Sequence, residues 1–160
     1  MTRFGLAFAV ALSVVAVLGL AGPVAAGEQV PFKGSLAGEA TVTPLTPPNV
    51  AIYVEAAGVA THLGQFELDI PHVVNRGDLT ARGYYEFTAA NGDKVYAEFT
   101  GQGTLTDVPG VVYIEETATI TGGTGRFAGA TGRINAERWF DTVAGTTTGS
   151  FDGTVSAPGS

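Results

Sequence analysis

Two charged residues interrupt rows of otherwise apolar side chains, and they are the strongest candidates for chemistry in this sequence. Along 112–120 every second residue is apolar except Glu116, and along 132–140 the corresponding row contains Arg138. A carboxylate in an apolar interior can act as a general acid or base, and a guanidinium can hold a ligand carboxylate or enolate. Glu116 is therefore the candidate catalytic residue, and Glu116 and Arg138 are both candidate ligand-binding residues.

The spacing of these two residues also fits an internal ion pair. If Thr121 pairs near Arg133 in a hairpin, Glu116 lies directly opposite Arg138, and the two side chains meet inside the fold. An isolated buried charge is unfavourable, and a partner of opposite charge is the usual remedy. A salt bridge that only fixes the strand register and a functional pair both remain open interpretations.

The two histidines share the inward-facing parity of their segment. His62 is a candidate ligand-binding residue at the mouth of the fold, whereas His72 follows Pro71 and is interpreted as a strand-end residue. Ten residues of extended chain separate them by roughly 30 Å, so one metal ion cannot bind both. There is no cysteine, no calcium-loop spacing and no Ser/His/Asp arrangement. We therefore expect no metal site and no cofactor.

The segment ITGGTGRFAGATG, residues 120–132, contains five glycines and a literal G-x-G-x-x-A pattern. That pattern indicates dinucleotide binding only between a parallel strand and a helix, and here both flanks are strand-like. The lysine of a phosphate-binding P-loop is also missing. The segment is predicted to be a compact hairpin connection with Phe127 as its apolar plug.

Alternation of apolar and polar residues recurs along the chain after residue 27, which predicts an all-β domain. Turn-type residues such as Asn91-Gly92-Asp93 separate the segments, so neighbours in sequence are expected to pair. Closure leaves no unpaired edge, which favours an eight-stranded antiparallel up-and-down barrel over an open sandwich. An outer-membrane barrel with its apolar face in lipid is a further alternative, but the apolar face carries many glycines and aromatic belts are not evident. The predicted strands are 30–43, 50–60, 62–73, 79–89, 94–106, 111–121, 132–141 and 146–155.

The N-terminus has the pattern of a secretory signal peptide. Arg3 precedes an apolar run, and small residues precede a cut after Ala26. Residues 1–26 are the predicted signal peptide and 27–160 the single β-barrel domain, secreted or periplasmic/extracytoplasmic; an uncleaved anchor is the alternative. Without Arg3, 7 basic residues face 15 acidic ones, a net charge of −8. We expect neither nucleic acid nor, after signal removal, a membrane as partner.

The segment VVYIEETATITGGTGRFAGATGRI resembles the strand, turn and strand of the allene oxide cyclase and dirigent-like barrel superfamily. GVATHLGQFELDI and FTAANGDKVYAEFTGQG resemble bacterial exported relatives. The resemblance implies an eight-stranded barrel, and in the plant members the interior binds an oily substrate: the cyclases close an unstable epoxide, and the dirigent proteins orient coupling radicals. Their trimers imply a homo-oligomer. No catalytic residue of either group matches a position here.

Three functions follow from these observations. The first is a secreted barrel that binds a small apolar molecule, with Arg138 available for an acidic group. The second is a cyclase/isomerase-like enzyme in which Glu116 polarises the substrate, and the third is a structural envelope protein without ligand. A core without voids favours the third, whereas a pocket lined by Glu116, Arg138 and His62 favours the first two.

Overall fold

The computed structural model describes residues 27–159, and its regular structure is β-strand except for one turn of 3-10 helix. The predicted signal peptide lies outside the described residues. No helix within residues 27–159 is long and apolar enough to cross a membrane. The elements are β1 (Gln29–Pro31), β2 (Gly34–Pro44), β3 (Asn49–Ala60), β4 (Gly64–Asn75), β5 (Thr80–Ala89), β6 (Lys94–Leu105), β7 (Val111–Gly123), η1 (Gly125–Phe127), β8 (Gly132–Asp141) and β9 (Thr146–Ser156).

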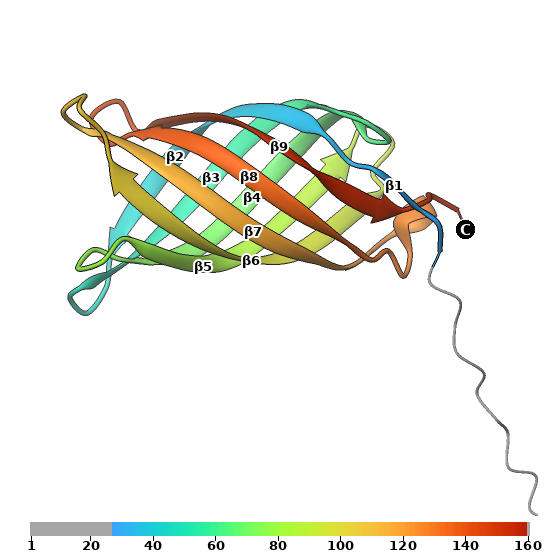
Figure 1. Ribbon diagram of the computed structural model, residues 1–160, viewed down its shortest axis with the longest axis horizontal. Coiled ribbons are helices and arrows are strands. Elements are labelled where there is room, and N and C mark those ends of the chain that lie inside the picture. Colours follow the sequence, from blue (N-terminus) through green and yellow to red (C-terminus); the bar gives the residue numbers. More distant parts are fainter. Residues whose placement is uncertain (1–26, 160) are drawn as a thin grey trace, which may run out of the picture.

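The strands form a closed antiparallel barrel in which each strand pairs with the next (Figure 1). β9 pairs with β8 on one side and with β2 on the other, which closes the sheet. β1 continues β2 in the same register, since Gln29 pairs with Ser156 and Gly34 pairs with Phe151. If β1 and β2 are counted as one strand, the barrel has eight strands, as predicted. The predicted strand 30–43 is interrupted only at Phe32 and Lys33.

The apolar side of every strand faces the barrel interior. Along β6, Val95, Ala97 and Phe99 are buried, whereas Glu98 and Thr100, which follow Ala97 and Phe99, are exposed. Successive side chains of a strand point to opposite faces, so alternation in the sequence becomes an apolar inside and a polar outside. The interior is the only place where these strands share a core, and any site built by inward residues must lie there.

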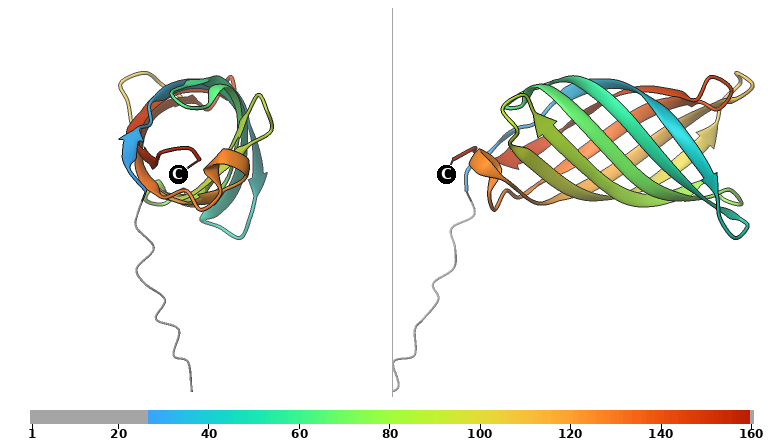
Figure 2. Two further views of the ribbon diagram at one scale, coloured as in Figure 1. Left: turned by 90° about the vertical axis from the view of Figure 1, so that its right-hand side faces the viewer. Right: turned by 180° about the vertical axis from the view of Figure 1, so that it is seen from behind.

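One end of the barrel is closed, and we call it the plugged end. The 3-10 helix η1 and the C-terminal segment lie across this end, which faces the viewer in the left panel of Figure 2. Phe127 is almost completely buried beneath η1, in the role predicted for it. The glycine-rich segment 120–132 is thus a strand connection, as predicted, and opens no helix of the dinucleotide-binding kind.

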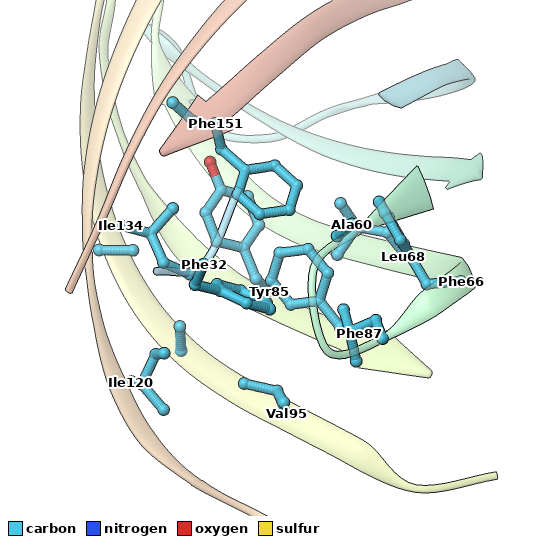
Figure 3. Packing of buried hydrophobic residues seen from close by; sticks show 14 of the residues in the cluster. Phe32, Ala60, Phe66, Leu68, Tyr85, Phe87, Val95, Ile120, Ile134 and Phe151 are labelled. Atoms are coloured by element: carbon cyan, nitrogen blue, oxygen red, sulfur yellow. The ribbon is translucent and has the colours of Figure 1, made fainter. Parts of the chain in front are cut away.

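Aromatic rings fill the interior next to the plugged end. Phe87 packs edge-on against Phe32 with ring centroids 5.6 Å apart and lies 5.4 Å from both Phe66 and Phe151. Figure 3 shows this cluster, with Ile120 and Ile134 on the surrounding wall. Because these rings occupy one half of the barrel, any internal space must lie in the other half.

Candidate functional site

The half of the barrel away from the plugged end contains a cavity of about 790 Å³. It opens between the loops 45–48, 76–79, 106–110 and 142–145, and we call this the open end. The wall is largely aliphatic, and the deepest charged residues on it are Glu116 and Arg138. The aliphatic side chains include Val42, Val50, Ile52, Val74, Leu105 and Ile114.

Glu116 and Arg138 form an ion pair inside the barrel. Arg138 Nε donates to Glu116 Oε2 at 2.8 Å, and Nη2 donates to Oε1 at 2.5 Å. The two residues are only 3% and 2% exposed. Two parallel hydrogen bonds between a guanidinium and a carboxylate give the pair a fixed geometry. The sequence therefore correctly placed both residues inside and together.

The register that led to this expectation is wrong by two residues. Glu116 pairs with Ala136, Arg138 pairs with Ile114, and Arg133 faces Thr119 instead of Thr121. The reason is that the last residues of β7 pair only with β6, so the β7–β8 ladder starts earlier along β7 than the turn residues suggested. Arg138 reaches Glu116 along the diagonal, which a long side chain can span.

Tyr85 and Thr147 complete the hydrogen bonds of the ion pair. The Tyr85 hydroxyl donates to Glu116 Oε2, and Arg138 Nη1 donates to Thr147 Oγ1 at 3.3 Å. Thr147 in turn donates to the backbone oxygen of Trp139 at 3.1 Å. We call His72, Tyr85, Glu116, Arg138 and Thr147 the polar layer, because they separate the cavity from the aromatic cluster. Within residues 27–159, no fully enclosed side-chain nitrogen or oxygen lacks a hydrogen-bond partner.

The charges of this layer balance. Burial alone would lower the pKa of Arg138, but the Glu116 carboxylate outweighs it and the pKa is raised, so the guanidinium stays charged. Burial, and then the negative charge of Glu116, raise the pKa of Tyr85 well above its ordinary value, so the phenol stays neutral. The cavity thus ends on one positive and one negative group that already bind each other.

Glycines on neighbouring strands make room for the polar side chains. Glu116 pairs with Gly101, where a Cβ would lie 2.8 Å from Glu116 Cγ. Arg138 pairs with Gly149, where a Cβ would lie 2.7 Å from Arg138 Cγ and 2.3 Å from a backbone oxygen. The long side chains can therefore lie along the barrel wall, and the space above them stays open as the cavity.

His72 belongs to this site although the sequence assigned it to a strand end. β4 continues to Asn75, so His72 is an interior strand residue, and it is 8% exposed on the cavity wall. Its Nδ1 lies 2.9 Å from the backbone oxygen of Ile70, and its ring packs 5.8 Å from that of Phe99. It also pairs with a glycine, Gly83, where a Cβ would lie 2.4 Å from His72 Cβ.

His62, by contrast, lies away from the other site residues. It is an exposed residue of the turn between β3 and β4, at the plugged end, with a positive φ of 63°. The predicted strand 62–73 began two residues too early because Thr61, His62 and Leu63 form the turn. The expected pocket lined by Glu116, Arg138 and His62 is therefore lined by His72 in place of His62.

Tyr85 and Thr147 were not predicted as site residues. Alternation predicts the face on which a side chain such as that of Tyr85 lies, but not its hydrogen-bond partners. One signal was available in the sequence: glycines on the apolar parity of adjacent strands mark places where a large neighbouring side chain lies flat. Among residues 27–159 no group of three or more His, Asp or Glu side chains could hold a metal ion.

No known family model matches this chain, and no curated protein matches it by sequence. The solved structures that are similar to it include two that are described as pterocarpan synthase dirigent proteins. GePTS1 superposes with a TM-score of 0.54 at 11% identity over 80% of this chain and 84% of its own. PsPTS1 superposes with a TM-score of 0.57 at 10% identity over 82% of this chain and 96% of its own. The chain therefore has the eight-stranded β-barrel fold of the dirigent proteins.

Proposed function

We propose that this protein binds a small, uncharged apolar molecule in the open half of its barrel. The observation that carries the proposal is the cavity of about 790 Å³ with largely aliphatic walls, set above a completed polar layer. Ligand pockets of proteins have volumes of roughly 300–1,000 Å³ and combine apolar walls with a few polar groups. A molecule that fills this space removes aliphatic surface from water, at about 25 cal/mol for each Å².

The internal ion pair supports an uncharged ligand. The sequence left Arg138 available for an acidic group, but its guanidinium already binds Glu116 through two hydrogen bonds. A ligand carboxylate would have to leave water for a cavity floor without net charge, and burial of an uncompensated charge is strongly unfavourable. Glu116 and Arg138 are proposed as the floor of the binding site, where they shape it and keep it polar.

The same geometry favours a binding protein over a cyclase/isomerase-like enzyme. Three hydrogen bonds, two from Arg138 and one from Tyr85, already occupy the carboxylate of Glu116. The Glu116 side chain is completely buried, so a substrate must displace one of these donors before Glu116 can exchange a proton with it. The filled core expected of a structural protein is present only beside the plugged end.

Export is proposed from the sequence and agrees with the position of the barrel in the chain. β1 begins at Gln29, three residues after the expected cut behind Ala26, so cleavage there leaves every strand intact. N-terminal sequencing of the protein from the culture medium or periplasm tests this, with Gly27 expected as the first residue. A mature protein that starts at Met1 would contradict it.

The predicted homo-oligomer also remains a proposal. Trp139 on the outer face is 45% exposed, and its ring packs 5.1 Å from that of Tyr113. An exposed aromatic pair of this kind is a candidate for a subunit contact. Sedimentation velocity of the wild type and Trp139→Ser tests it: identical monomeric behaviour would contradict self-association.

Ligand binding is tested with the neutral fluorophore N-phenyl-1-naphthylamine, whose emission rises in apolar surroundings. We expect saturable uptake with one molecule per barrel. Ala81→Trp, which fills part of the cavity, should weaken uptake at least about tenfold, because the new ring occupies the ligand's volume. Ala57→Trp on the exposed face of β3 is the matched control and should leave uptake unchanged. Absent uptake, or equal effects of both substitutions, would contradict the proposal.

Native mass spectrometry of the protein purified from its own cells gives an independent test. A small molecule that remains bound to the barrel and is lost on unfolding is the expected result. If the same molecule is converted during incubation, the enzyme interpretation is favoured instead.

A further inference from the structure

One ring nitrogen of His72, a residue of the cavity wall, is a hydrogen-bond acceptor. Its Nδ1 lies 2.9 Å from the backbone oxygen of Ile70. A carbonyl oxygen can only accept, so the hydrogen of the neutral imidazole must lie on Nδ1. The other ring nitrogen, Nε2, then carries an unshared electron pair and no hydrogen.

This Nε2 has no partner among residues 27–159. The hydrogen bonds of His72 comprise only the one to Ile70. Every fully enclosed side-chain nitrogen or oxygen of the described residues has a hydrogen-bond partner. Because Nε2 has none, it cannot be fully enclosed by protein atoms. His72 lies on the wall of the cavity, together with Glu116 and Arg138.

The surroundings keep the imidazole neutral. Burial lowers the pKa of His72, the hydrogen bond to Ile70 opposes this, and the positive charge of Arg138 lowers the pKa further. The charged groups that act on it are Arg138 of β8, which lowers its pKa, and Glu116 of β7, which raises it; the neighbouring Tyr85 of β5 is neutral. At neutral pH, Nε2 is therefore an acceptor among groups whose own hydrogen bonds are already made.

We propose that His72 determines which polar group the ligand carries: the site selects an aliphatic alcohol, whose hydroxyl donates to Nε2. This inference rests on the proposed binding function. A carboxylate or an ether offers only acceptor atoms, so its oxygen would face the electron pair of Nε2 without a hydrogen between them. A buried acceptor that loses water without gaining a donor disfavours such ligands.

The experiment compares three ligands with the same chain length as competitors of N-phenyl-1-naphthylamine at pH 7.5: 1-decanol, its methyl ether and decanoate. In the wild type, decanol should compete at least about tenfold better than the ether, the size expected for one buried hydrogen bond. His72→Leu should reduce this preference to within about twofold. His72→Gln, whose amide oxygen accepts hydrogen bonds, should restore part of it, and His62→Leu is the control at the plugged end that should leave it intact.

The outcomes separate this inference from the function on which it rests. If the wild type does not take up the fluorophore, the proposed function is wrong. If it does, but decanol and the ether compete equally or His72→Leu keeps the preference, the role of His72 is wrong and the cavity stands. Should His72→Leu fail to fold, the wild type is measured at falling pH: once the imidazole is protonated, Nε2 becomes a donor and the preference for decanol over the ether must shrink. A constant preference through the protonation would overturn the inference.

Discussion

Arg138 and Glu116 bind each other through two hydrogen bonds although they are not direct partners in the β7–β8 ladder. Each side chain lies over a glycine of the strand on its other side, Gly149 for Arg138 and Gly101 for Glu116. The two side chains lie flat along the barrel wall and contact each other diagonally for one reason. Each glycine leaves space that the long side chain of the neighbouring strand occupies.

Removal of one charge of the ion pair should destabilise the barrel strongly. Arg138→Met leaves the Glu116 carboxylate without its main partner in the interior, and a loss of about 3–5 kcal/mol in the free energy of unfolding is expected. The double variant Glu116→Gln/Arg138→Met has no buried charge and should be more stable than the sum of the two single losses implies. Urea unfolding of all three variants measures this. Strict additivity of the two losses would show that the side chains do not act as a pair.

The Tyr85 hydroxyl should contribute measurably to stability. Tyr85→Phe removes its hydrogen bond to the Glu116 carboxylate and keeps the ring that stacks on Phe99 at 4.6 Å. A loss of about 1.5–3 kcal/mol is expected, as for other hydrogen bonds to charged groups. The control is Tyr84→Phe, the exposed tyrosine next in the same strand, with an expected change within about 0.5 kcal/mol. Equal melting temperatures of the two variants would argue against this role.

Gly149 should be intolerant of even a methyl group. A Cβ there would lie 2.3 Å from the backbone oxygen of Glu137, which cannot move without disturbing the β8–β9 ladder. Gly149→Ala is expected to lower the free energy of unfolding by about 1–3 kcal/mol. Gly103→Ala, on the same inner face, is the comparison, because its nearest neighbour is a side-chain atom of Val112 at 3.1 Å. In thermal unfolding, Gly149→Ala should melt at a much lower temperature than Gly103→Ala, and the reverse order would contradict this packing.

His72 should make the barrel less stable in acid. Burial lowers its pKa in the folded state below the ordinary value of about 6.5. As the pH falls, the unfolded chain therefore binds the proton before the folded protein does. The free energy of unfolding keeps its full value above about pH 6.5 and decreases as the pH falls from there through the folded-state pKa. His72→Gln should flatten the fall in unfolding free energy between pH 7.5 and pH 5 relative to the wild type.

The second histidine provides the control for this experiment. His62 is exposed in a turn, so His62→Gln should keep the slope of the wild type. Urea unfolding at several pH values gives both slopes. If both substitutions change the slope equally, a buried neutral His72 is not its source.

Much of the barrel could be predicted because alternation is a local property. Each strand carries its own inside and outside, so Glu116 and Arg138 were placed inward without knowledge of the pairing. The predicted register was wrong by two residues, yet the faces stayed correct, because a shift of two returns every side chain to the same side. Register itself depends on how the connection is built, and here Gly123 pairs with Val95 of β6 instead of with β8.

The position of a residue along the barrel axis was the harder quantity to predict. His62 and His72 have the same parity, but one lies in an exposed turn and the other beside Glu116 and Arg138. Whether a residue lies in a turn or inside the barrel depends on the exact end of the strand. His62 has a positive φ and belongs to the turn, so the pairing of β3 with β4 ends earlier than the sequence indicated. Hydrogen-bond partners such as Tyr85 depend on three strands at once and carry no signal within any one of them.

Because the plugged end is closed, any ligand of this barrel must enter and leave through the open end. An elongated ligand must enter with one end first. This end stops at the polar layer, and the opposite end faces solvent. The barrel would therefore recognise the end of the ligand that enters first and not the opposite end. Compounds that share this end group but differ in length, or that are attached to a larger molecule, would bind alike.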